Sequence, residues 1–222
     1  MLKASGLRYE IIVVDDGSTD DTVGVVQGLC LKLKGLSLKS LSTNRGKGAA
    51  VRAGMLAAIG NVRLFSDADG STPPEQIASM LKALRDESLD VVIGSRYLDA
   101  SVVTRAQPKL RVVWSRFTNM VVQRILLPGI RDPHCGFKAY TAAATRQVFS
   151  RCHIDGWAFD LEALAIARSL DLRIKEIPVI WANDKRSKGR IRHLPREICS
   201  VYKIRKRVKK QVLLNVDPLD NN

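Results

Sequence analysis

As far as residue 95, the chain alternates short apolar runs of strand type with segments of helical spacing. β-Branched and aromatic residues dominate the runs, and turn residues close them. This alternation predicts an α/β domain with a mostly parallel sheet and helices on both faces. The expected strands cover residues 10–14, 36–41, 62–66 and 90–94, and the expected helices cover residues 22–33, 47–59 and 72–85. Ligands of such open sheets bind where the strands end, so the residues after each strand are the first candidates for a site.

Two aspartates, Asp67 and Asp69, directly follow the third expected strand. The turn formers Gly70, Pro73 and Pro74 cannot continue a strand, so both carboxylates lie where a strand ends and a loop begins. Two acids this close repel each other unless a cation lies between them, and oxygen ligands suit Mg²⁺ or Mn²⁺ carrying a diphosphate. The alternative is a pair of solvated turn aspartates, one of which caps the next helix.

Other polar residues are expected at the same edge of the sheet. The first expected strand runs into Asp15 and Asp16, which either accept hydrogen bonds from a nucleobase or ribose or cap the following helix. A glycine-rich turn, Asn44 to Gly48, opens the next helix; its N–H groups can approach a phosphate, to which Lys47 adds a charge. The same small residues are also typical of close helix–sheet packing. Arg96, after the fourth expected strand, can neutralise phosphate.

Between residues 130 and 182 the pattern is less regular. A polar loop at 132–138 leads into a strand, and a helix is expected from Asp160 to about Leu170. Asp160 is free to face the cleft, whereas Glu162 cannot share its helix face and is expected to form a local ion pair. Residues 172–181 read as a strand at a sheet edge because they contain Pro178.

The positive charge is concentrated at one end of the 222-residue chain, whose formal net charge is +14. Residues 183–210 contain twelve Lys or Arg and two acids, so the partner of this end is expected to be anionic: a lipid surface, a phosphate or a nucleic acid. A basic amphipathic helix from about Arg196 to Val212 is typical of a membrane-surface element. Residues 109–127 form a second amphipathic segment, either interfacial, with Trp114 and Phe117 at the apolar boundary, or an ordinary packed surface helix.

Several classes of site and protein are disfavoured. The four cysteines and three histidines have no metal-ligand spacing, so reduced thiols and no zinc site are expected. No apolar run reaches 18 residues, which predicts no transmembrane helix within this sequence, and no signal peptide is evident. A nucleic-acid-binding protein is disfavoured, because the aromatic content is 5% and no binding motif occurs.

Six motifs occur in a characteristic order and together cover most of the chain from Glu10 to Trp181. They lie at residues 13–20 (VVDDGSTD), 44–48 (NRGKG), 67–70 (DADG), 94–97 (GSRY), 132–138 (DPHCGFK) and 157–162 (WAFDLE). In this order they resemble family 2 glycosyltransferases with the GT-A fold. Within that family the chain is most similar to the dolichyl-phosphate β-glucosyltransferases and polyprenyl-phosphate sugar synthases.

The resemblance implies an inverting transfer of a hexose from a nucleotide-sugar donor to a polyprenyl or dolichyl phosphate, with a divalent cation, Mg²⁺ or Mn²⁺, as cofactor. The implied roles are nucleotide-sugar binding by Asp15, Asp16, Lys47 and Asp67, metal binding by Asp67 and Asp69, and phosphate binding by Arg96 and Lys138, with Asp160 as a further candidate catalytic residue. Ser71 stands where mannosyl-type members carry glutamine, which favours UDP-glucose over GDP-mannose or another donor.

The same resemblance implies a peripheral protein at the cytoplasmic face of a membrane. Family members begin with a strand and loop of the nucleotide pocket that have no counterpart before Glu10. We therefore expect an N-terminally truncated catalytic domain at 1–182, a basic membrane-proximal extension at 183–222, and a neighbouring strand with unpaired backbone groups. We expect weak or absent activity, and an inactive membrane-associated fragment is the alternative. A membrane-protein partner or a missing membrane segment are further possibilities for how the chain reaches the membrane.

Overall fold

The computed structural model describes residues 6–105, 109–182 and 194–215. Its strands are β1 (Ile11–Asp15), β2 (Leu36–Ser40), β3 (Val62–Ser66), β4 (Val91–Ser95), β5 (Val102–Arg105), β6 (Phe137–Thr141), β7 (Ile174–Pro178) and β8 (Ile180–Ala182). Its helices are α1 (Thr22–Lys32), α2 (Lys47–Ala57), α3 (Ile77–Asp86), α4 (Lys109–Ile125), α5 (Ala142–Phe149), α6 (Phe159–Ser169) and α7 (Leu194–Asn215), with a 3₁₀ turn η2 (Pro74–Gln76) before α3. The predicted strand–helix alternation up to residue 95 is confirmed.

The central sheet has the strand order β3-β6-β4-β7. β4 and β7 are parallel, as predicted, but β6 lies antiparallel between β3 and β4, so this sheet is mixed. The register pairs Lys138 of β6 with Phe65 on one side and with Ile93 on the other. β4 is buried along its whole length, because it has a strand on either side and helices against its faces.

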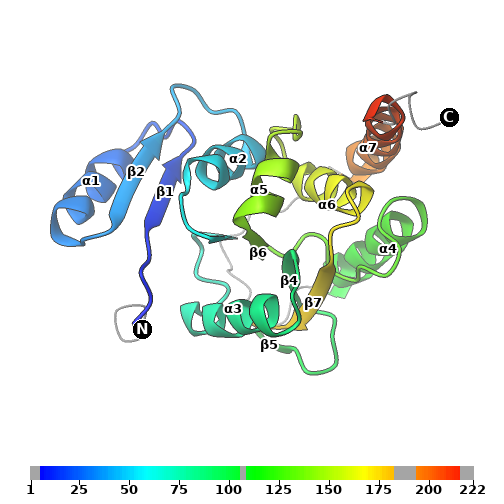
Figure 1. Ribbon diagram of the computed structural model, residues 1–222, viewed down its shortest axis with the longest axis horizontal. Helices are drawn as coiled ribbons and strands as arrows, with labels where there is room; N and C mark the ends of the chain where they lie inside the picture. Colours follow the sequence, from blue (N-terminus) through cyan, green and yellow to red (C-terminus); the bar gives the residue numbers. More distant parts are fainter. Residues whose placement is uncertain (1–5, 106–108, 183–193, 216–222) are drawn as a thin grey trace, which may run out of the picture.

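β1 and β2 form a parallel pair separate from the central sheet, as Figure 1 shows. Among the described strands, β1 pairs only with β2 and β3 pairs only with β6, so each keeps one edge without a strand partner. The predicted truncation of the domain stays a prediction. Helix α2 contacts both β1 and β3. The Glu10 carboxylate adds a further link, because it accepts hydrogen bonds from the N–H groups of Ile59 and Gly60 just after α2.

Local geometry departs from the predictions at two places. The helix predicted from residue 72 begins later: η2 leads into α3 at Ile77, without a side-chain cap. The strand predicted over 172–181 is two strands: β7 lies at the edge of the central sheet, and β8 pairs with β5, which was not predicted. Residues 109–125 form the single helix α4.

The hydrophobic core surrounds helix α6, which is buried along nearly all its length. Helix α7 packs on α4 and α6, with the side chains of Val201 and Ile204 buried in this core (Figure 1). The C-terminal helix therefore packs into the body of the domain. Residues 183–193, the first part of the predicted basic extension, lie outside the described residues. In the described ranges, no helix combines the length and apolar character needed to cross a membrane.

Candidate functional site

Strand β3 places Asp67 beside the start of helix α2. The N–H of Asp67 donates to the carbonyl of Gly136, and its carboxylate Oδ1 lies 2.6 Å from Nζ of Lys47, the first residue of α2. Both side chains are partly exposed, at 36% for Asp67 and 20% for Lys47. Two residues that the sequence placed at the same sheet edge are therefore in direct contact, and the charge of Asp67 is neutralised by a lysine.

Gly136 leaves the space that the Asp67 carboxylate occupies. A Cβ atom built on Gly136 would lie 2.1 Å from Oδ2 and 2.5 Å from Oδ1 of Asp67, far inside van der Waals contact. No side chain other than hydrogen fits there while Asp67 keeps this position. Gly136 belongs to the motif at 132–138, which was the available signal, but the sequence alone did not indicate this contact.

The second aspartate of the pair shapes the loop after β3. Asp69 accepts a hydrogen bond from the N–H of Ser71 at 2.9 Å, and the carbonyl of Ser71 accepts from Ala182 at the end of β8. Ser71 is buried, so this loop is fixed against the β5–β8 pair.

The donor set of Asp67 and Asp69 fits a divalent cation whose remaining ligands come from a substrate. No group of three or more His, Cys, Asp or Glu side chains able to hold a metal occurs within the described ranges. Mg²⁺ commonly binds through one or two carboxylates together with water and the phosphate oxygens of a nucleotide. Two carboxylates at the end of a strand match this mode of binding and do not match a structural metal site closed by protein ligands.

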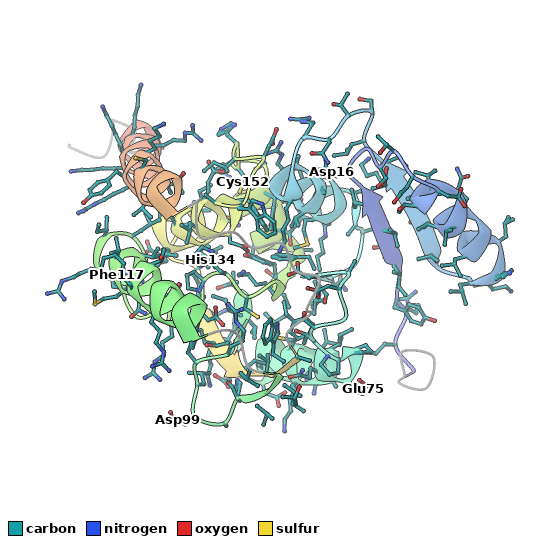
Figure 2. The ribbon with its side chains drawn as sticks, turned by 180° about the vertical axis from the view of Figure 1, so that it is seen from behind. Asp16, Glu75, Asp99, Phe117, His134 and Cys152 are labelled. Atoms are coloured by element: carbon teal, nitrogen blue, oxygen red, sulfur yellow. The ribbon has the colours of Figure 1, made fainter. Side chains whose placement is uncertain are left out.

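Asp15 and Asp16 bind backbone N–H groups of their surroundings. Buried Asp15 accepts from the N–H of Ser18, and the two oxygens of Asp16 accept from Arg45 at 2.9 Å and Gly46 at 2.7 Å. Asp16 thus connects the end of β1 to the turn that opens α2 (Figure 2). In this structure both carboxylates shape loops, and the predicted contact with a nucleoside stays a prediction.

The glycine-rich turn packs against another loop. Gly46 has φ +114°, and Cβ atoms on Gly46 and Gly48 would lie 2.6 Å from the carbonyl oxygen of Asp155 and 2.4 Å from that of Ile154. The N–H of Ala49 donates to the Asp155 carbonyl. The start of α2 is therefore covered by residues 154–156, which favours the close-packing alternative, and the predicted contact with a phosphate stays a prediction.

Asp155 also binds two arginines with its carboxylate. Its Oδ2 lies 2.9 Å from Arg45 and its Oδ1 lies 2.6 Å from Arg52. Partial burial alone would raise the pKa of Asp155, but the hydrogen bonds and charges of both arginines lower it. Asp155 precedes the motif at 157–162 by two residues, and the sequence offered no signal for this contact.

Arg96 forms a buried ion pair with Asp132. Its Nε and Nη2 donate to Asp132 Oδ2 and Oδ1, both at 2.8 Å, and its backbone N–H donates to Oδ2. Burial alone would lower the pKa of Arg96, but the hydrogen bonds and charge of Asp132 outweigh it and raise that pKa; the arginine in turn lowers the pKa of Asp132. The guanidinium was expected to meet a phosphate. Here its charge is neutralised, and its planar group lies near the rings of Tyr97 and Trp181.

Lys138 and Asp160 form a second buried pair. Nζ of Lys138 lies 2.5 Å from Oδ1 of Asp160 and 2.6 Å from the carbonyl of Cys135, and the lysine side chain is fully buried. Lys138 is in the middle of β6, between two other strands, and its side chain is enclosed by the protein. This corrects the expectation that Lys138 presents its charge to a phosphate and that Asp160 faces an open cleft.

Glu162 has a long-range partner, not the predicted local one. Its buried carboxylate accepts from the N–H groups of His153 and Ile154 and from Nη1 of Arg207 on α7. It therefore joins the loop that covers α2 to the C-terminal helix. The sequence could not indicate this pair, because 45 residues separate its members.

Exposed aromatic surface adjoins the Lys47–Asp67 pair. Nζ of Lys47 lies 5.3 Å from the ring centroid of Trp157 and 5.8 Å from that of Phe159. The side chain of Trp157 is 71% exposed. A carboxylate pair, a movable ammonium group and an exposed indole are thus gathered at the carboxyl end of β3, where they can meet an anionic, sugar-bearing ligand.

Known proteins are similar to this chain in sequence. The chain matches the family described as Glycosyl transferase family 2 over residues 1–149. A dolichyl-phosphate beta-glucosyltransferase from Drosophila melanogaster is 38% identical over 187 residues, covering 81% of this chain and 57% of the relative. The protein of that name from Homo sapiens is 36% identical over 188 residues, covering 81% and 58%. The chain thus spans less than three fifths of the length of these relatives.

Solved structures share the fold. Glucosyl-3-phosphoglycerate synthase from Mycobacterium tuberculosis, in complex with Mn²⁺, UDP-glucose and glycerol 3-phosphate, has a TM-score of 0.61 at 18% identity, covering 87% of this chain and 68% of that one. Mannosyl-3-phosphoglycerate synthase from Rubrobacter xylanophilus has a TM-score of 0.62 at 18% identity, covering 97% and 68%. These similarities confirm the predicted GT-A fold.

Proposed function

The chain belongs to glycosyltransferase family 2, and from this premise we propose that it takes part in an inverting transfer of glucose from UDP-glucose to dolichyl phosphate or a similar polyprenyl phosphate. The observation that carries the proposal is its similarity to dolichyl-phosphate beta-glucosyltransferases, which extends over 81% of the chain. The geometry supports it, because Asp67 directly follows strand β3 and lies beside a lysine, with Asp69 two residues later in the same loop.

In this proposal, one oxygen of the acceptor phosphate attacks C1 of the glucose, and the bond between C1 and the diphosphate oxygen breaks. The acceptor oxygen is already anionic at neutral pH, so the reaction does not require a strong general base. This agrees with the structure, in which Asp160 is buried and paired with Lys138.

The leaving diphosphate gains negative charge, which must be neutralised. Asp67 and Asp69 would hold Mg²⁺ or Mn²⁺, and the ion would supply positive charge to the diphosphate oxygens when bound. Lys47 forms the ion pair with Asp67 that the structure describes, and both side chains are partly exposed. In this proposal the buried Arg96–Asp132 pair does not contact the diphosphate. It holds the loop at 131–132 against the end of β4.

We further propose that the protein works as a peripheral protein at the cytoplasmic face of a membrane, where a polyprenyl acceptor resides. The apolar stripe of α7 is buried against the domain, so α7 would meet the lipid surface through its exposed lysines and arginines. Helix α4 adds apolar contact through Phe117, which Figure 2 labels, and through Met120. Their side chains are 44% and 51% exposed. The side chain of Trp114 lies outside the described residues.

A transfer assay tests the proposed function. Labelled UDP-glucose or GDP-mannose is incubated with dolichyl phosphate in detergent, with Mn²⁺, with Mg²⁺ or with EDTA. We expect weak organic-phase label from UDP-glucose that requires the metal and is lost in Asp69→Ala. Label from GDP-mannose alone would contradict the proposed donor, and equal label from wild type and Asp69→Ala would contradict the proposed site.

A further inference from the structure

We propose that Lys47 is the counterion of Asp67 in the metal-free protein and that it releases this carboxylate when a divalent cation and a diphosphate bind together. Lys47 would thereby make metal binding depend on the nucleotide. The nucleotide part of this inference rests on the proposed function, whereas the competition between Lys47 and a divalent cation concerns Asp67 alone.

The first argument is the contact itself. Nζ of Lys47 lies 2.6 Å from Oδ1 of Asp67, at the distance of a short charge-assisted hydrogen bond. A divalent cation needs lone pairs of the same carboxylate, and its charge would repel the ammonium group. Gly136 limits any rearrangement of Asp67, because the carboxylate lies directly against its Cα. The lysine is therefore the side chain that has to move.

The second argument is that Lys47 is able to move. Its side chain is a flexible four-carbon stem that ends in a point charge, so the ammonium group can shift without movement of α2. The start of α2 is itself fixed, since Asp16 binds Gly46 and the loop at 154–156 covers Gly48. The rings of Trp157 and Phe159, at 5.3 and 5.8 Å from Nζ, offer electron-rich faces beside the pair.

The third argument is the charge balance. Asp67 and Asp69 carry two negative charges, and Lys47 lies in contact with Asp67, whereas Asp69 accepts the N–H of Ser71. A divalent cation alone would add two positive charges next to that lysine. A diphosphate that arrives with the metal brings negative charge, to which the released ammonium group can bind. Metal and diphosphate should therefore bind cooperatively, each strengthening the other by the same factor.

The test measures Mn²⁺ binding directly, from the electron paramagnetic resonance signal of free Mn²⁺. Wild type, Lys47→Met, Lys47→Gln and Lys47→Arg are titrated without nucleotide and then with UDP. We expect Lys47→Met and Lys47→Gln to bind Mn²⁺ about tenfold more tightly than wild type without UDP, and UDP to strengthen Mn²⁺ binding much less than in wild type. Lys47→Arg keeps the charge and should behave like wild type.

The matched control is Lys175→Met. Lys175 also forms a 2.6 Å ion pair with a carboxylate, Glu87, but on an exposed surface between β7 and the end of α3. Its removal should leave Mn²⁺ binding unchanged. Fluorescence gives an independent readout, because Trp157 lies beside Lys47; addition of Mn²⁺ with UDP should change the emission of wild type more than that of Trp157→Phe.

The outcomes separate this inference from the proposed function. The inference is overturned if Mn²⁺ binds no more tightly to folded Lys47→Met and Lys47→Gln than to wild type. It is also overturned if wild type and both of these variants fail to bind Mn²⁺. If both variants bind Mn²⁺ more tightly but no protein binds UDP or transfers glucose, the competition at Asp67 stands and the proposed function fails. Circular dichroism of each variant establishes that it is folded.

Discussion

The carboxylate of Asp67 lies directly against the Cα of Gly136, at a position where a Cβ atom would be 2.1 Å from Oδ2. The contact joins the end of β3 to the loop before β6, and the N–H of Asp67 donates to the carbonyl of the same glycine. The orientation of the proposed metal ligand therefore depends on the absence of a side chain on a neighbouring strand.

Substitution of this glycine should affect the site more than the fold. In Gly136→Ala the new methyl group would displace the Asp67 carboxylate, so we expect a loss of more than about tenfold in Mn²⁺ affinity and in glucose transfer, at a destabilisation of about 1–3 kcal/mol. Thermal unfolding and Mn²⁺ titration measure the two effects. Gly28→Ala is the control, because open space surrounds Gly28 in α1; wild-type affinity in Gly136→Ala would contradict the prediction.

The pair of Arg96 and Asp132 should make stability depend on pH in acid. The folded-state pKa of Asp132 is lowered, so its stabilisation is complete above the unfolded value of about 3.9 and is lost as pH falls through the folded pKa. In Asp132→Asn this contribution is absent, and we expect about 2 kcal/mol less stability at pH 7 and a smaller further loss below pH ~4. Urea unfolding at a series of pH values measures both effects.

Asp86→Asn is the control for this prediction, because Asp86 pairs with Arg85 on an exposed surface. It should retain the stability and the acid dependence of wild type. An acid dependence in Asp132→Asn equal to that of wild type would show that other carboxylates dominate the loss.

Removing one member of the buried Lys138–Asp160 pair should lower the free energy of unfolding strongly, whereas replacing both members by apolar residues should lower it little. Lys138→Met leaves Asp160 as an unpaired buried carboxylate, so we expect a loss of about 3–5 kcal/mol of stability. The double variant Lys138→Met/Asp160→Leu removes both charges and should recover most of that loss. Denaturant unfolding of the two single variants and the double variant completes the cycle. A double variant as unstable as Lys138→Met would show that the pair contributes more than mutual neutralisation.

The exposed lysines of α7 should control binding to anionic lipid. Removal of three of them in Lys203→Ser/Lys206→Ser/Lys210→Ser should weaken binding to phosphatidylserine-containing vesicles by about 3 kcal/mol, or about a hundredfold, at low salt. Co-sedimentation with the vesicles measures the change. The control removes Lys32, Lys34 and Lys39, which are exposed near α1 and β2, far from α7 (Figure 1). Equal losses in both triple variants would mean that net charge alone drives binding.

Much of the fold was predictable because local rules apply to it. Apolar runs closed by turn residues located β1 to β4, and helical spacing located α1, α2 and most of α3. β5 was missed because it is a short strand whose partner, β8, lies 77 to 78 residues further along the chain. The antiparallel insertion of β6 was also not predicted, since a strand's apolar pattern does not show which neighbours it pairs with.

The candidate site was predictable in its members and not in its contacts. The sequence by itself determined that Asp67, Asp69 and Lys47 stand at the ends of a strand and a helix, because turn residues and glycines mark those ends. Only the tertiary structure decided that Lys47 neutralises Asp67 and that Arg96 and Lys138 are neutralised by Asp132 and Asp160. The physical reason is that a charge removed from water, wholly or in part, is stabilised by an opposite charge that the fold brings close, and these partners are 20 to 36 residues away in the chain.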